Sequence, residues 1–407
     1  MYILYVVFFF DNLYDKIRIN WNKRGVILVK KVKILHCSDI HFDTPFKELP
    51  KEIGTMRRAE LRESFSKIIN RGIDEKVDLV LLAGDLFDND TIEKSTLTFI
   101  KDQMDKLKKH NIRVFISAGN HDPYNKKSFY NMVNLGENVH IFKDEIERIE
   151  IPELNTVVYG ASFKEKYMRE SNLKEFTPKE EDKDLVKIMV LHGDLGNNET
   201  GEYNPLLFKE IEESKMDYIA LGHIHKFSGI KRIGNTYYAY SGCPEGRGFD
   251  EAGDKGIILG EVSLGVVDLD FIKTNKREYF LKEIDISNCK TKEEVIDKIL
   301  NTISKESREK NLFKIILKGN IEESFKIDSD LIENLIRDKF FYCKIVNSTR
   351  MKVDIDEMSN EYSIKGIFCS LIKNALESNE EDEEILDIAF RIGIESILDG
   401  EVNLNDN

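Results

Sequence analysis

Cysteine is scarce in this sequence, and no two cysteines form a Cys-x-x-Cys pair. The five cysteines are scattered along the chain at Cys37, Cys243, Cys289, Cys343 and Cys369. This spacing implies no disulfide framework and indicates reduced thiols, so we expect a cytoplasmic protein.

Long apolar runs are missing as well. Residues 1–10 are apolar, but such a run is too short to span a bilayer, and neither a positive segment nor a small-residue cleavage site marks a signal peptide. We therefore expect residues 1–31 to be a disordered or misannotated extension. Residues 23–26 have the form of a translated purine-rich ribosome-binding site, which would place the true start near Val29.

A surplus of positive charge is also lacking, since the formal net charge is -14. This argues against a uniformly basic nucleic-acid binder but leaves room for a local positive site made by bound metal. At 407 residues the chain exceeds what one core usually holds, so we expect two or three domains.

What the sequence does contain is a set of apolar strands that stop at polar residues. Residues 79–83 are apolar without a helical period and end abruptly at Gly84 and Asp85. A run that is apolar on both faces is typical of a parallel strand covered by helices, and ligands bind beyond the carboxyl ends of such strands. Asp85 is then a site residue, although an aspartate in this place can also cap a following helix.

Four other predicted strands lead into similar polar groups: a short strand from residue 32 that ends in Asp39 and His41, and residues 112–118, 186–191 and 218–221. On an extended chain the side chains i and i+2 point the same way, so Asp39 and His41 can hold one ion, and His223 with His225 repeats that geometry. Five of the eight histidines lie at these strand ends. The candidate ligands are Asp39, His41, Asp85, Asn120, His192, His223 and His225.

This set of oxygen and imidazole ligands is large enough for two metal ions. One carboxylate shared between them would hold the pair at the roughly 3.5–4 Å separation used in two-metal hydrolysis. Hydroxide between two divalent ions is nucleophilic near neutral pH. We therefore predict metal-dependent hydrolysis.

The polar turns at residues 84–88, 119–123 and 220–226 read GDLFD, GNHDP and ALGHIHK. These motifs resemble those of calcineurin-like metallophosphoesterases, and within that superfamily they are most similar to DNA-repair exonucleases of the SbcD and YhaO type. The resemblance covers roughly residues 32–265. It implies an α/β fold, with a metallophosphoesterase β-sandwich flanked by helices, a smaller α/β capping domain and C-terminal helices.

We place the domain boundaries where the character of the sequence changes. The metallophosphoesterase domain is expected at 32–273, the α/β capping domain at 274–352 and the C-terminal helical segment at 353–407. Helices are predicted at 56–75 and 91–110, where they would cover the sheet.

The resemblance also implies how the ligands are divided between two ions. One ion is assigned to Asp39, His41, Asp85 and His225. The other is assigned to Asp85, Asn120, His192 and His223, so that Asp85 bridges the pair. Nucleases of this type prefer manganese, and iron or zinc would fit the same ligands.

His121 is left over from the ligand set. We predict that it is the acid that protonates the leaving oxygen, with Asp122 orienting its ring. In the alternative interpretation His121 only shapes the turn. Arg247, in the flexible loop at residues 242–249, is a candidate contact to a backbone phosphate of DNA.

The predicted function is that of a DNA exonuclease or endonuclease of double-strand-break repair. SbcD-like nucleases act with a coiled-coil ABC-type ATPase that grips a C-terminal helical segment. The helix predicted at 383–398 has an apolar face that would suit such a partner or fold back on the capping domain. The residues of that face are Ile385, Leu386, Ala389, Ile392, Ile397 and Leu398. Ile388, Phe390 and Ile394 widen the apolar surface beyond this single stripe.

Other functions and partners remain open at this point. The chain could be a phosphoesterase for small molecules or proteins, which its acidic charge would suit, or a scaffold without catalytic activity. A homodimer is a further assembly that the sequence leaves open, and no membrane association is expected.

Overall fold

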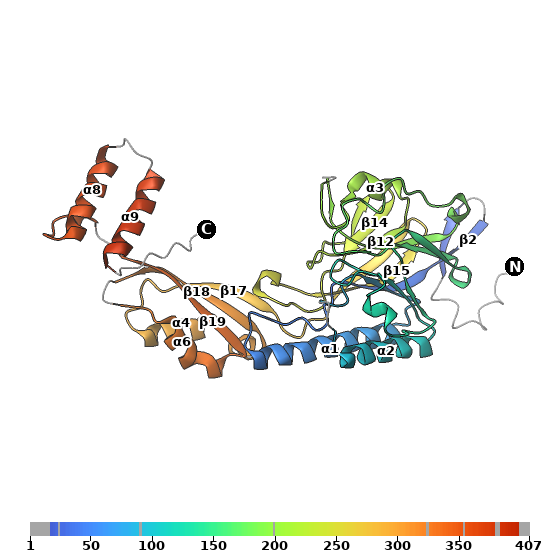
Figure 1. Cartoon of the computed structure of the whole chain (residues 1–407), viewed down its shortest axis with the longest axis horizontal. Helices are drawn as coiled ribbons and strands as arrows, with labels where there is room; N and C mark the ends of the chain where they lie inside the picture. Colours follow the sequence, from blue (N-terminus) through green and yellow to red (C-terminus); the bar gives the residue numbers. More distant parts are fainter. Residues whose placement is uncertain are drawn as a thin grey trace, which may run out of the picture. The chain divides into compact units, whose positions relative to one another are not determined.

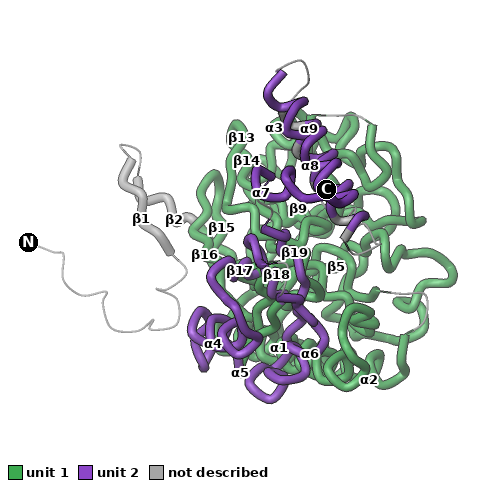
Figure 2. Tube along the Cα trace, turned by 90° about the vertical axis from the view of Figure 1, so that its left-hand side faces the viewer, with its two compact units in different colours: residues 1–281, 310–313 green, residues 282–309, 314–407 purple. Residues whose placement is uncertain are grey.

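The computed structural model divides the chain into two compact units (Figures 1 and 2). Unit 1 holds Met1–Leu281 and Lys310–Phe313, and unit 2 holds Lys282–Glu309 and Lys314–Asn407. The residues described are 17–22, 25–88, 92–197, 200–322, 325–352, 355–378 and 383–398. Most of the predicted capping segment and the whole C-terminal segment fall in unit 2, whereas residues 274–281 and 310–313 belong to unit 1. We keep the division at residue 352 as a proposal.

Unit 1 is built around two six-stranded sheets, the first of which has the order β16-β15-β3-β4-β5-β6. Its strands are β3 (Val32–Cys37), β4 (Leu79–Ala83), β5 (Arg113–Ser117), β6 (Val139–Ile141), β15 (Gly256–Ser263) and β16 (Val266–Lys273). Strands β3 to β6 run parallel, and β15 pairs antiparallel with β3 and β16. All residues of β4 are buried, as a run that is apolar on both faces requires.

The second sheet has the order β13-β14-β12-β9-β8-β7. Its strands are β7 (Glu147–Ile151), β8 (Thr156–Gly160), β9 (Val186–His192), β12 (Tyr218–Gly222), β13 (Lys231–Ile233) and β14 (Thr236–Tyr240). The four inner strands run parallel, and β7 and β13 pair antiparallel at the two edges. Two parallel sets therefore end in the same unit, where their carboxyl ends can meet.

The two sheets pack face to face around a shared core. Leu81 and Phe115 of the first sheet belong to the same apolar cluster as Ile188 of the second. The other face of the first sheet packs in a separate cluster with Phe65 of α1 and Met104 of α2. The helices are α1 (Lys51–Asp74), α2 (Lys94–Lys109) and the short α3 (Phe208–Glu213). The fold is thus the predicted β-sandwich flanked by helices (Figure 1).

Part of the predicted N-terminal extension forms a small sheet of its own. Strands β1 (Ile17–Asn22) and β2 (Gly25–Lys30) pair antiparallel with each other. Residues 1–16, 23 and 24 lie outside the described residues, and the assignment of residues 1–31 as foreign to the domain stays a prediction. Among the described helices, none is long and apolar enough to cross a membrane.

A three-stranded sheet with the order β17-β18-β19 lies mostly in unit 2, and the first residues of β17 and β18 belong to unit 1. The strands and helices of this region are β17 (Tyr279–Asp285), α4 (Lys292–Thr302), α5 (Lys305–Lys310), β18 (Leu312–Ile321), α6 (Ser329–Ile336) and β19 (Tyr342–Met351). Helices α4 and α6 lie along one side of this sheet (Figure 1), and their buried residues include Val295 and Ile332. This is the smaller α/β domain that the sequence predicted.

The chain continues into α7 (Ile355–Met358) and a pair of longer helices, α8 (Ile364–Ser378) and α9 (Glu383–Leu398). Phe368 of α8 stacks on Phe390 of α9, with ring centroids 6.2 Å apart. Cys369 and Ile394 belong to the same small cluster. The two helices therefore pack on each other.

This packing corrects the predicted apolar face of the last helix. Leu386 and Ile394 are buried, whereas Ile385 and Ile397, which we expected on the same face as Leu386, are exposed. Residues four apart lie one above the other on a helix, so the side facing α8 follows Leu386, Phe390 and Ile394. The sequence pattern alone could not choose between these two faces, because both are apolar.

Candidate metal centre

The candidate ligands come after the carboxyl ends of parallel strands from both sheets. Asp39 and His41 follow β3, Asp85 follows β4, Asn120 follows β5, His192 ends β9, and His223 and His225 follow β12. The structure brings them together in two groups that could each hold a metal ion: Asp39, His41 and His225, and Asp85, His192 and His223. The centre thus lies where ligand sites are found in parallel sheets.

The chain enters the centre through tight turns. Asp39, His41 and Asp85 have φ values of 53°, 53° and 50°, a left-handed conformation that is costly for residues other than glycine. The Asp39 N–H donates to Gly84 O at 3.0 Å, and the His41 N–H donates to Asp85 O at 2.9 Å. Our expectation that Asp39 and His41 lie on an extended strand is therefore wrong, because β3 ends at Cys37.

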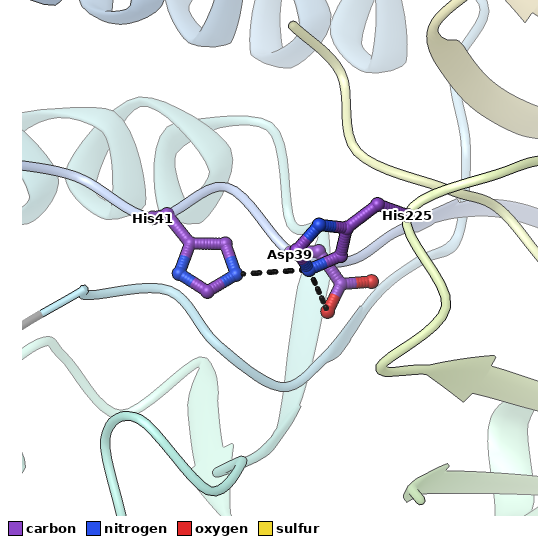
Figure 3. Close-up of side chains that lie close together, drawn as sticks. All are labelled: Asp39, His41 and His225. Carbon is purple, nitrogen blue, oxygen red and sulfur yellow. Dashed lines mark hydrogen bonds and ion pairs between the residues drawn. The ribbon is translucent and has the colours of Figure 1, made fainter. Parts of the chain in front are cut away.

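Asp39, His41 and His225 form the first group (Figure 3). The Nε2 atoms of His41 and His225 are 3.3 Å apart, and His225 Nε2 lies 3.9 Å from Asp39 Oδ1. Asp85 also reaches this group, since its Oδ2 lies 3.5 Å from His41 Nε2. These four side chains are the ones that the resemblance assigned to one ion.

Asp85, Asn120, His192 and His223 form the second group. Asp85 Oδ2 lies 3.4 Å from His192 Nε2. Asn120 Oδ1 lies 3.0 Å from His192 Nε2 and 3.2 Å from His223 Nδ1. One oxygen of Asp85 thus faces an imidazole of each group, which is the arrangement that a bridging carboxylate requires.

Three of the imidazoles are held from behind by an oxygen acceptor. The contacts are His41 Nδ1 to Asp88 Oδ1 at 2.9 Å, His225 Nδ1 to Glu251 Oε1 at 2.7 Å and His192 Nδ1 to Ala83 O at 2.9 Å. At His41 and His192 such an acceptor favours a proton on Nδ1, so that Nε2 turns a lone pair toward the centre. At His225 the Arg247 guanidinium, which can only donate, also lies 3.1 Å from Nδ1, so Glu251 and Arg247 favour opposite tautomers of that ring.

The centre is consequently lined by acceptors. His41 Nε2 faces His225 Nε2 across 3.3 Å, and Asn120 Oδ1 faces His192 Nε2 at 3.0 Å. Such contacts are unfavourable unless a proton or a cation lies between the acceptors. Carboxylate, amide-oxygen and imidazole ligands without thiolate suit manganese, iron or zinc. The residues present therefore fit divalent metal ions.

A proton on His192 is the alternative to a cation. Burial lowers the pKa of this ring, but the Asp85 carboxylate outweighs burial and raises the pKa to about 9. Burial likewise raises the pKa of Asp85, and the imidazoles of His192 and His41 overcome that effect and lower it. A divalent cation would replace the proton on His192, so that metal binding would release a proton below about pH 9.

His121 lies at the edge of the centre. Its side chain is 40% exposed, and its Nδ1 is 3.6 Å from Asp88 Oδ1. The ring meets the His41 ring edge-on, with centroids 4.9 Å apart. His121 is thus close enough to the centre to act there while remaining open to solvent.

The predicted role of Asp122 in orienting the His121 ring is wrong. The buried Asp122 carboxylate accepts hydrogen bonds from the N–H groups of Leu86, Phe87 and Gly119 and from the Tyr130 hydroxyl. Because these donors come from the turns after β4 and β5 and from the segment beyond them, Asp122 ties the two turns together. The carboxylate beside the His121 ring is Asp88.

Sequence reasoning missed Asp88 and Glu251, and it treated Arg247 as an exposed loop residue. The Arg247 side chain is 18% exposed and forms ion pairs with Asp88 at 3.1 Å and with Glu251 at 3.0 Å. It therefore fixes both carboxylates that hold the first-group imidazoles. Asp88 could have been found from the motif at residues 84–88, whereas no spacing in the sequence marks Glu251.

A cavity of about 530 Å³ opens beside the centre. Its lining includes Asn120 and His121, the cations Lys47, Lys166 and Arg247, and the carboxylates Glu48, Asp88, Asp250 and Glu251. Lys47 and Lys166 are exposed, so their charges are available to a phosphate in the cavity. The size is within the range of small-molecule sites.

Residues 32–227 match the family model described as calcineurin-like phosphoesterase. This chain carries a calcineurin-like metallophosphoesterase domain. All seven candidate ligands lie within the matched residues. The metallophosphoesterase is therefore a hydrolase of phosphoester bonds whose activity depends on divalent metal.

Several curated proteins are similar to this metallophosphoesterase. An uncharacterized metallophosphoesterase YhaO of Bacillus subtilis is 27% identical, over 73% of this chain and 74% of its own length. A DNA double-strand break repair protein Mre11 of Methanocaldococcus jannaschii is 27% identical, over 81% of this chain and 92% of its own. A DNA double-strand break repair protein Mre11 of Sulfolobus acidocaldarius is 25% identical, over 88% of this chain and 94% of its own length. The matches to the two Mre11 proteins are longer than unit 1, so they extend into unit 2.

Proposed function

We propose that this metallophosphoesterase is a DNA nuclease that uses two divalent metal ions, with manganese as the preferred metal. The observation that carries the proposal is the position of Asp85 Oδ2, 3.5 Å from His41 Nε2 and 3.4 Å from His192 Nε2. The similarity to relatives described as DNA double-strand break repair proteins, which extends over both units, supports DNA as the substrate.

We propose the division of the ligands that the resemblance implies. Asp39, His41, Asp85 and His225 would hold one ion, and Asp85, Asn120, His192 and His223 would hold the other. When bound, such ions activate water and neutralise the charge on phosphate oxygens.

The chain's own residues supply positioning and proton transfer. Asp88, Glu251 and Arg247 fix the imidazoles of the first group. His121, which lines the cavity and is open to solvent, is placed to donate a proton to the leaving ribose oxygen. Because Arg247 already pairs with two carboxylates, Lys47 and Lys166 are better candidates for contacts to backbone phosphates.

The proposal is tested with end-labelled duplex DNA and with a chromogenic phosphodiester, each with and without manganese. We expect both substrates to be hydrolysed only when manganese is present. Hydrolysis of the chromogenic ester without any hydrolysis of DNA would favour a phosphoesterase for small molecules or proteins. Metal binding without hydrolysis of either substrate would favour a scaffold.

We also propose that the α8–α9 pair binds a coiled-coil ABC-type ATPase, the partner that the SbcD-like resemblance implies. Ile364, Ile367 and Leu371 form a stripe along α8 in which the residues are 77%, 65% and 62% exposed. Exposed apolar stripes of this kind dock into partner surfaces. Since the chain carries a net charge of -14, such a partner would also provide basic surface for DNA.

The cellular setting is part of the same proposal. All five cysteines are free and buried, and we propose that the protein works in the cytoplasm, where thiols stay reduced. A homodimer through the same α8 stripe is the competing assembly.

A further inference from the structure

A row of aromatic contacts leads from the metal centre to the protein surface. The ring centroids of His192 and His223 are 5.1 Å apart, those of His223 and Tyr203 are 5.0 Å apart, and those of Tyr203 and Tyr167 are 5.8 Å apart. Exposure increases along the row, since His192 is buried, Tyr203 is half-buried and Tyr167 is 50% exposed. A single ring therefore separates an exposed tyrosine from a candidate metal ligand.

The backbone holds the two tyrosines in a fixed relation to the centre. The Met168 N–H donates to Glu202 O at 2.8 Å, and the Asn204 N–H donates to Met168 O at 2.7 Å. The Asn204 side-chain amide in turn donates to His192 O at 2.8 Å. The segments that carry the tyrosines are thus paired with each other and attached to the strand end that presents His192.

The outermost ring of the row, Tyr167, is half exposed, so part of it is open to another flat ring. The planes of Tyr203 and Tyr167 are inclined by 35°, and those of Tyr203 and His223 by 38°. These angles are closer to a stacked than to an edge-on arrangement. Aromatic side chains so exposed beside a cleft are the groups on which unpaired nucleobases stack.

Lys166 connects this row to the cavity beside the metal centre. Its Nζ lies 5.6 Å from the centroid of the Tyr167 ring, and the same residue lines the cavity together with Asn120 and His121. A cation next to an exposed ring matches the two parts of a nucleotide, because the base can stack while the phosphate meets the ammonium group.

From these contacts we infer that Tyr167 and Lys166 form a subsite for one unpaired nucleotide that flanks the scissile phosphodiester. The base stacks on Tyr167, and Lys166 contacts a phosphate of the same strand. The nucleotide has to be unpaired because a base inside a duplex already has neighbours on both faces. This inference rests on the proposed nuclease function and adds to it the two residues that would hold the unpaired nucleotide.

The base contact is tested with nitrophenyl esters that differ only in the base. The substrates are the nitrophenyl phosphodiesters of thymidine, in the 5′ and the 3′ series, and the same esters of deoxyribose without a base. Tyr167→Ala should lower kcat/KM for one of the thymidine esters by roughly 5- to 100-fold, the usual worth of base stacking. The base-free esters should be unaffected, and Tyr167→Phe should behave like wild type.

Tyr362→Ala is the matched control, because Tyr362 is also an exposed tyrosine but belongs to unit 2. An equal effect of Tyr167→Ala on esters with and without the base, or no effect on either, would overturn the inference. If the wild-type protein hydrolyses neither these esters nor end-labelled DNA, the proposed function itself fails, which is a different outcome.

The phosphate contact has a separate readout that does not need catalysis. Binding of a single-stranded oligonucleotide that contains 2-aminopurine is followed by quenching of that base at several salt concentrations. Lys166→Gln should reduce the slope of log affinity against log salt by about 0.7, the value for one phosphate contact on a single strand. Tyr167→Ala should remove the quenching, and Tyr167→Phe should keep it. An unchanged slope removes Lys166 from the subsite, and persistent quenching in Tyr167→Ala removes the stacking platform.

Discussion

Asp85 occupies a position in which one carboxylate has to serve two groups of ligands. It lies within 3.5 Å of His41 and of His192, and it accepts a hydrogen bond from the His121 N–H at 2.9 Å. We predict that Asp85→Asn loses bound metal and activity together, because the amide would turn a donor or a neutral oxygen toward both imidazoles. An aspartate that only capped a helix would cost about 1 kcal/mol of stability and leave catalysis intact.

Metal content by mass spectrometry and hydrolysis of a chromogenic ester are the measurements for this variant. Asp102→Asn, at an exposed position of α2, is the matched control and should keep both. Two bound ions in an active Asp85→Asn protein would remove the bridging role.

His121 separates metal binding from proton transfer. Because it is an acid in our proposal and not a ligand, His121→Ala should keep both metals and slow DNA hydrolysis by about 10²- to 10⁴-fold. A nitrophenyl ester should be affected much less, since its leaving group needs no proton. Loss of metal in this variant, measured on the purified protein, would mean that His121 is a ligand.

The sequence could predict the candidate ligands but not the residues that hold them in place. Each candidate ligand lies at or just after the end of an apolar strand, so the apolar run in the sequence predicts where the ligand is. Asp88 and Glu251 act from a turn and a loop, and they meet His41 and His225 only after the chain has folded. Their pairing with Arg247 therefore could not be read from local sequence.

At the scale of the elements, the turns after the strands have to approach one another closely. A Cβ atom on Gly119 would lie 2.1 Å from Asp85 Oδ1, whereas one on Gly54 in α1 would make only an ordinary contact at 3.5 Å. We predict that Gly119→Ala displaces the Asp85 carboxylate and lowers metal content as well as activity. Gly54→Ala should leave both unchanged and raise stability by up to about 1 kcal/mol. Full metal content in Gly119→Ala would show that the two turns can move apart.

The strands themselves could be predicted, but the conformation of these turns could not. An apolar run fixes where β3 and β4 are buried, and the next residues take left-handed φ values only because the neighbouring turn supplies hydrogen bonds. His223, with a φ of 107°, departs in the same way from the extended geometry that we expected for it and His225. The hydrogen bonds that offset the cost of these φ values come from tertiary contacts, which the propensities of the local sequence cannot predict.

At the scale of the whole molecule, one buried histidine links stability to pH. The ring of His36 contacts the Tyr218 hydroxyl at 2.9 Å and Leu221 O at 3.1 Å, and burial lowers its pKa from 6.5 to about 3. Below pH 6.5 the unfolded chain binds a proton that the folded chain excludes. The contribution of His36 to stability is therefore full above that pH and falls by about 1.4 kcal/mol per unit as the pH decreases toward 3.

The substitution His36→Gln removes this titration while keeping a polar side chain. The difference in unfolding free energy between variant and wild type should be constant above about pH 7. Between about pH 6 and 4, wild type should lose about 1.4 kcal/mol of unfolding free energy relative to the variant for each pH unit. Urea denaturation at several pH values measures it, and a difference that does not vary with pH would contradict the assignment.

The α8–α9 pair provides the last prediction, because its packing separates a covered face from an uncovered one. Phe368, Phe390 and Ile394 pack against one another between the two helices. By contrast, Ile367 and Leu371 on α8 are 65% and 62% exposed. Substituting both with Asp should abolish co-purification with the ATPase and leave metal binding and ester hydrolysis intact, since every proposed ligand lies in unit 1. Ile367→Leu with Leu371→Met keeps the apolar area and should retain the partner. If the Asp variant still binds the ATPase, the docking site lies elsewhere; if it binds the ATPase but no longer associates with itself, the stripe is a homodimer surface.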